Sequence, residues 1–183
     1  MRAAYDGGCR AFDFSFGPVR AMFERFRDSV EEAVVGYATP TFLQGCKLHG
    51  TDLQSLRSRV LPTFTTCPGY WDAAWAAKVR DDLRVNTCMV FGHDPEAKPL
   101  SDAEIAALYL DEDTFAARLD ELRGSSFVLI GGTDADWLFT LGREDLIARM
   151  AEIVRSRGQQ PVLICHYAST VLPKADAMKL DVD

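Results

Sequence analysis

Apolar and polar residues alternate along this chain with two different periods. Residues 11–16 (AFDFSF) place three phenylalanines on one face of an extended chain and Ala11, Asp13 and Ser15 on the other. This two-residue period is typical of a β-strand. Residues 143–158 instead carry apolar side chains at the three- and four-residue spacing of an amphipathic helix. The chain therefore combines both kinds of element.

The same patterns predict an alternating order of elements. Helices over 51–60 and 101–109 would begin with capping boxes, formed by Thr51 with Gln54 and by Ser101 with Glu104. Strands followed by helices indicate a parallel α/β sheet. The expected strands are 11–16, 33–39, 87–92, 126–132 and 161–167. The expected helices are 17–28, 51–60, 71–83, 101–109, 114–123 and 143–158.

Two architectures fit this order: a (β/α) TIM-like barrel and an open doubly wound sheet. The polar face of residues 11–16 favours the barrel, because a strand of an open sheet is usually apolar on both faces. A complete barrel has roughly 250 residues, and this chain has 183. We therefore expect one α/β domain over residues 1–183 that is an incomplete barrel or part of a larger one. Such a domain would form a homo-oligomer or a complex with another chain.

The composition of the chain argues against some classes of binding partner. The net charge is −7, with 20 basic and 27 acidic residues and no basic cluster, which argues against binding to nucleic acid or an anionic membrane. No apolar run approaches the roughly 20 residues that span a bilayer. The five cysteines form no CxxC motif, and their odd number indicates reduced thiols in a cytoplasmic protein.

Candidate site residues follow the expected strands, because parallel α/β folds bind ligands at the carboxyl ends of their strands. All three histidines of the chain fall in this set. Imidazoles and carboxylates can shuttle protons or bind a divalent metal ion. The candidates are Asp13, Ser15, Lys47, His49, His93, Thr133, Asp134, Asp136, His166 and Tyr167.

The stretch 127–142 (FVLIGGTDADWLFTLG) has two interpretations. Its glycines could end a buried strand and deliver Asp134 and Asp136 to the mouth of a site. Alternatively, one of these aspartates caps a short helix that contains Trp137. Neither GxGxxG nor GxxxxGK[ST] is present, so the stretch does not indicate a nucleotide site.

The leading hypothesis is a cytoplasmic enzyme of the lyase, aldolase or hydrolase kind that acts on a small polar metabolite by general acid–base chemistry. The predicted catalytic residues are Asp13, Asp134 and His166. Ser15, Lys47, Thr133 and Tyr167 would contact the substrate. The only cofactor considered is a divalent metal ion, held by Asp134, Asp136, His49 and His93, although no HxH or HExxH motif is present. The alternative hypothesis is a non-catalytic α/β ligand-binding module or a subunit of a larger assembly.

Overall fold

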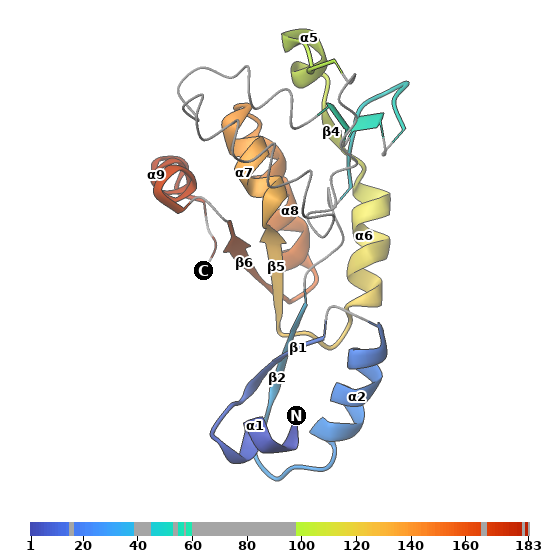
Figure 1. Cartoon of the computed structure of the whole chain (residues 1–183), viewed down its shortest axis with the longest axis vertical. Helices are drawn as coiled ribbons and strands as arrows, with labels where there is room; N and C mark the ends of the chain where they lie inside the picture. The colour runs from blue at the N-terminus through green and yellow to red at the C-terminus, as the bar shows by residue number, and fades with distance from the viewer. Residues whose placement is uncertain are drawn as a thin grey trace.

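A computed structural model describes residues 1–14, 17–38, 45–52, 55–56, 58–59, 98–165, 168–180 and 182. The fold is mixed α/β, as predicted (Figure 1). The expected helix 71–83 and the expected strand 87–92 lie outside these residues. None of the described helices is long and apolar enough to cross a bilayer.

Four strands form a parallel sheet in the order β1-β2-β5-β6. They are β1 (Ala11–Asp13), β2 (Val35–Ala38), β5 (Phe127–Gly131) and β6 (Gln160–Ile164). Each coincides with a strand expected from the sequence, and β5 and β6 are neighbours, as one helical crossover between them predicts. Two shorter strands, β3 (Cys46–Lys47) and β4 (Tyr109–Leu110), form a separate antiparallel ribbon.

The described helices that were expected differ from the predictions at their ends, whereas α1 and α9 are not among the expected helices. The capping box of Ser101 with Glu104 is confirmed, but its helix ends at Ala106 and the chain continues into β4. The expected capping box of Thr51 with Gln54 involves a residue outside the described part of the chain; beside it, Asp52 accepts a hydrogen bond from the Ser55 amide at 3.0 Å. The helices are α1 (Arg2–Asp6), α2 (Gly17–Arg27), α5 (Asp102–Ala106), α6 (Glu112–Glu121), α7 (Thr133–Thr140), α8 (Glu144–Ser156) and α9 (Ala168–Met178).

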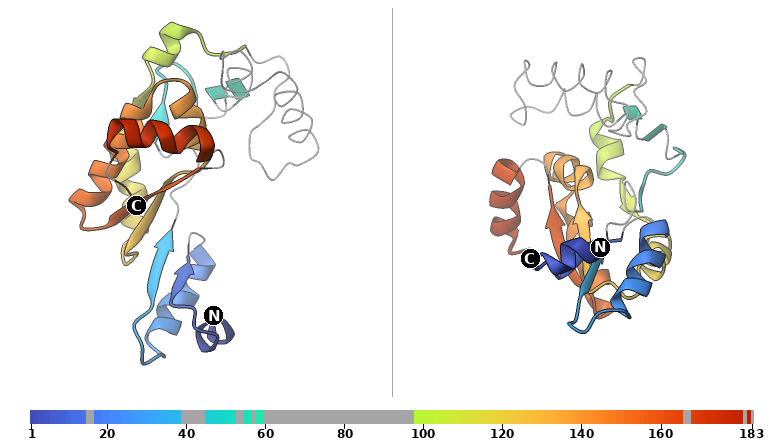
Figure 2. Two further views of the ribbon diagram at one scale, coloured as in Figure 1. Left: turned by 90° about the vertical axis from the view of Figure 1, so that its left-hand side faces the viewer. Right: turned by 60° about the horizontal axis from the view of Figure 1, so that its bottom comes forward.

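The N-terminal β1-α2-β2 unit has a small core of its own. Phe12 and Phe14 are buried against Phe23 of α2, and the Phe14 and Phe23 rings stack with their centroids 5.1 Å apart. Both phenylalanines therefore lie under α2. A Cβ at Gly36 would lie 2.0 Å from the Phe14 ring, so only glycine allows this packing. Figure 2 shows this unit, with α1 beside it, extending away from helices α7, α8 and α9.

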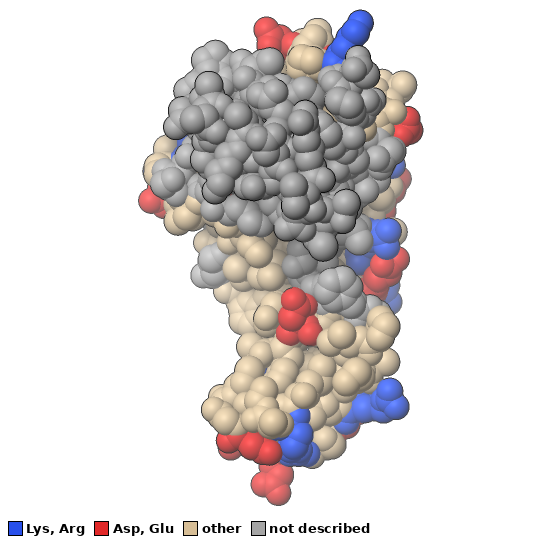
Figure 3. Space-filling view, in the orientation of Figure 1, with Lys and Arg blue, Asp and Glu red and all other residues tan. Residues whose placement is uncertain are grey.

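The larger core surrounds β5, α7 and α8. The apolar stripe of α8 is buried as predicted, and this helix packs on β5 and β6 as well as on α6 and α7. Helix α7 is enclosed on all sides, since Trp137, Leu138 and Phe139 have no exposed surface. Surface charges are mixed in sign on the face drawn in Figure 3, where described acidic and basic side chains lie side by side. Several described charged side chains form ion pairs, as Arg149 does with Glu112.

The ion pair of Glu104 makes stability dependent on pH. Its carboxylate accepts hydrogen bonds from Arg59 Nη1 and Nη2, both at 2.7 Å, and from the Ser101 amide. These hydrogen bonds lower the pKa of Glu104 from 4.5 to about 2, and those from Arg59 have the largest effect. A carboxyl group whose pKa is lower in the folded state stabilises the fold above its unfolded pKa, and this contribution is lost as the pH falls toward the folded pKa.

We expect Glu104→Gln to lower the free energy of unfolding by about 1 kcal/mol at neutral pH, because glutamine keeps the capping geometry and loses only the charge. The difference from wild type should disappear as the pH approaches about 2, where the Glu104 carboxyl group is half protonated. Urea unfolding of both proteins at several pH values measures this. Glu152→Gln is the control, since Glu152 is 61% exposed in its pair with Arg149. A pH-independent deficit in Glu104→Gln would contradict the assignment.

Candidate functional site

The turn from β5 to α7 is tightly packed against the end of β6. Gly131 has φ 100° and Gly132 has φ 66°, a region of backbone conformation that favours glycine. A Cβ at Gly131 would lie 2.6 Å from the Ile164 carbonyl oxygen and 2.7 Å from the Ala135 Cβ. The Gly132 amide donates to the same carbonyl oxygen at 2.5 Å. These glycines therefore allow α7 to begin directly on β6.

Asp134 and Asp136 lie in the first turn of α7, and each is only 1% exposed. The prediction of a short helix containing Trp137 is confirmed, but neither aspartate is its N-cap. That position belongs to Gly132, which has no side-chain capping bond. Negative charge near a helix N-terminus is favourable. The Asp134 carboxylate also accepts a hydrogen bond from Trp137 Nε1 at 3.4 Å.

The Asp134 carboxylate acts electrostatically on a buried thiol. Cys46 in β3 has no exposed surface, and burial raises the pKa of its thiol well above the usual range, with the charge of Asp134 as the next cause. Cys46 is therefore a protonated thiol and a poor nucleophile. Cys46 and Trp137, the hydrogen-bond partner of Asp134, belong to the same buried core. The sequence analysis assigned no role in the site to Cys46 or Trp137. Cys46 is distant from Asp134 in sequence, so no local pattern relates the two. Asp134 and Trp137, in contrast, have the i, i+3 spacing that brings side chains together on a helix.

Lys47 and His49 lie on or beside the ribbon. The Lys47 ammonium group donates to the Asp111 carboxylate and, at 3.2 Å, to Thr114 Oγ1. Asp111 is the N-cap of α6, and the Lys47 hydrogen bond is the main reason that its pKa falls from 3.8 to about 2. The exposed His49 ring stacks on Tyr109 with ring centroids 4.4 Å apart. Lys47 thus joins the ribbon to α6.

Asp13 is exposed on the face of the sheet opposite Phe12. In the strand register Asp13 pairs with Tyr37, and Tyr37 pairs with Phe127 at the start of β5. Gly131 is four residues further along β5 (131 − 127 = 4), a rise of about 13 Å at roughly 3.3 Å per residue. The structure therefore does not bring Asp13 level with the turn that carries Asp134.

The structure describes only some of the remaining candidate residues. Thr133 is the first residue of α7. Ile164 pairs with Gly131, so the end of β6 lies beside the β5-α7 turn, as expected. Among the residues that the structure describes, no group of three His, Cys, Asp or Glu side chains is arranged to hold a metal ion. Ser15, His93, His166 and Tyr167 lie outside the described residues.

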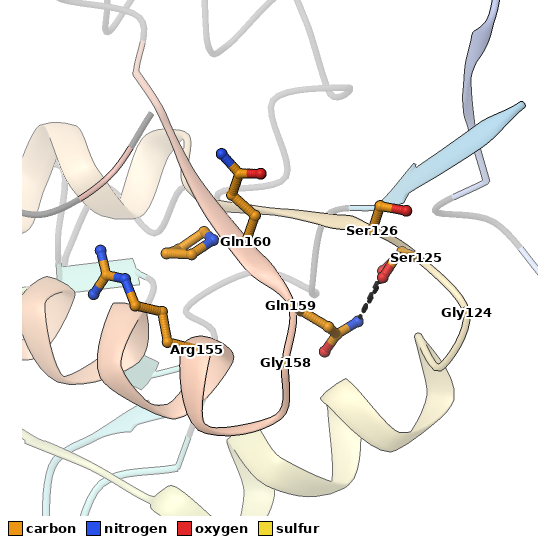
Figure 4. A pocket seen from close by; sticks show the side chains of 8 residues that line it. Gly124, Ser125, Ser126, Arg155, Gly158, Gln159 and Gln160 are labelled. Atoms are coloured by element: carbon orange, nitrogen blue, oxygen red, sulfur yellow. Dashed lines mark hydrogen bonds between the residues drawn. The ribbon is translucent and has the colours of Figure 1, made fainter.

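A hollow of ≈ 590 Å³ lies at the opposite, amino end of β5 and β6 (Figure 4). The turns that follow α6 and α8 line it, and Gln159 Nε2 joins them by donating to Ser125 Oγ at 3.0 Å and to the Leu122 carbonyl oxygen at 3.3 Å. The one cationic side chain in its lining, Arg155, lies in the last turn of α8. A positive charge there complements the negative end of the helix dipole.

Comparison of the chain with protein-family models, with curated proteins and with solved structures found no match.

Proposed function

We propose that the chain is an enzyme, or the α/β part of one, that acts on a small polar metabolite by general acid–base chemistry at the carboxyl end of β5 and β6. The observation that carries this proposal is the pair of buried carboxylates, Asp134 and Asp136, at the turn that leaves a central strand. Burying a carboxylate is costly. Helix capping does not account for either group, because Gly132 is the N-cap.

The proposed chemistry assigns a role to each group. A carboxylate can act as a general acid or base when it lies within hydrogen-bond reach of the reacting group. Asp134 would move the proton, and the Trp137 N–H would orient its carboxylate. His166, two residues beyond Ile164, would be the second proton-transfer group. Asp13 is not part of this centre, because the register sets it about 13 Å further back along the sheet.

The finer architecture that we propose is an incomplete (β/α) barrel. Among the described strands, the order β1-β2-β5-β6 follows the chain without a reversal. A doubly wound sheet has a point where the strand order reverses. In a barrel the exposed face of β1, with Asp13, would be the interior face.

A ligand screen with a matched pair of variants tests the proposed site. We expect a small polar metabolite, with or without a divalent metal ion, to raise the melting temperature of the wild-type chain saturably. Asp134→Asn should weaken that binding at least tenfold, about 1.4 kcal/mol. Asp113→Asn is the control, since Asp113 lies in the first turn of α6 but is exposed, and it should bind as the wild type does. Equal binding by both variants would place the site elsewhere.

The alternative function is a non-catalytic ligand-binding module. It predicts the same saturable binding but no turnover, so product analysis after incubation with the bound metabolite distinguishes the two. Catalysis that is lost in Asp134→Asn would support the enzyme. Binding without turnover in the wild-type chain would favour the module.

We also propose that the chain forms a homo-oligomer or pairs with another chain through the edge strands. Within the described sheet the edges are β1 and β6, and Ile164 at the end of β6 is 37% exposed. Edge strands readily pair with other strands.

Light scattering at micromolar concentration should therefore give at least twice the chain mass of 20.3 kDa. Ile164→Lys should reduce that mass, because a charge at the edge opposes pairing. Met22→Lys, at a 54% exposed position on α2, should leave it unchanged. A monomeric mass for the wild-type chain would contradict self-association.

A further inference from the structure

No further inference is drawn: the strongest candidate, the open hollow at the amino ends of β5 and β6, is a seam whose Gln159 and Ser125 side chains hydrogen-bond across two turns and whose Arg155 complements a helix C-terminus, so nothing in it indicates a ligand.

Discussion

Replacing Gly131 with alanine is expected to destabilise the chain by about 2–6 kcal/mol. A non-glycine residue held in an unfavourable backbone conformation costs roughly 1–3 kcal/mol, and overpacking costs roughly 1–3 kcal/mol more. Both apply at Gly131, whose φ is 100° and whose added Cβ would meet the Ile164 carbonyl oxygen at 2.6 Å. That oxygen belongs to the backbone of β6, so it cannot move away as the tip of a flexible side chain could.

Gly8→Ala separates the two causes of this loss. Gly8 has φ 95°, close to that of Gly131, but nothing lies within 4 Å of its added Cβ. Gly8→Ala should therefore show the conformational cost alone, about 1–3 kcal/mol. Urea unfolding of both variants measures the difference, which is the cost of the contact between the β5-α7 turn and β6. Equal losses in the two variants would mean that the turn has room to relax.

The same turn shows where sequence reasoning succeeds and where it stops. The apolar run of β5 and the stripe of α8 are local signals, and both elements lie where they were expected. Helix α7 is less evident because it is buried on all sides and begins at a glycine without a side-chain cap. Its sequence, TDADWLFT, has polar residues at both ends and apolar residues between them, so it carries no clear amphipathic period. The buried state of Asp134 therefore could not be read from its neighbours in sequence.

Contacts between segments that are distant in sequence also could not be predicted from the sequence. The ribbon joins Cys46 to Leu110, and no periodic pattern marks strands of two residues. The stagger that separates Asp13 from the β5-α7 turn depends on the register of three strands. Helix α9 went without a prediction, since Pro173 lies inside it and proline usually interrupts a helix. Topology, rather than local pattern, thus decides which candidate residues meet.

Arg143 provides another contact between distant segments, and it joins α5 to the start of α8. Its Nη1 donates to the carbonyl oxygens of Ile105 and Leu108, both at 2.7 Å, just where α5 ends. The same guanidinium donates to both carboxylate oxygens of Asp145 at 2.9 Å. The Arg143 side chain is only 16% exposed. The Leu108 amide also donates to the Ile105 carbonyl oxygen, at 3.2 Å, so Arg143 is a second donor to that group at the end of α5.

Arg143→Met is expected to lower the free energy of unfolding by about 2–4 kcal/mol, because it removes the charged hydrogen bonds to the half-buried Ile105 and Leu108 carbonyl groups while keeping the aliphatic stem. Arg149→Met is the matched control: Arg149 also forms a two-bond pair with a carboxylate, that of Glu112, but is 47% exposed. Its loss should cost about 0–1 kcal/mol. Urea unfolding at neutral pH compares the two. Equal losses in Arg149→Met and Arg143→Met would mean that the ion pair with Asp145, and not the carbonyl contacts, accounts for the effect of Arg143. Added salt should then reduce the loss of unfolding free energy in both variants to the same extent.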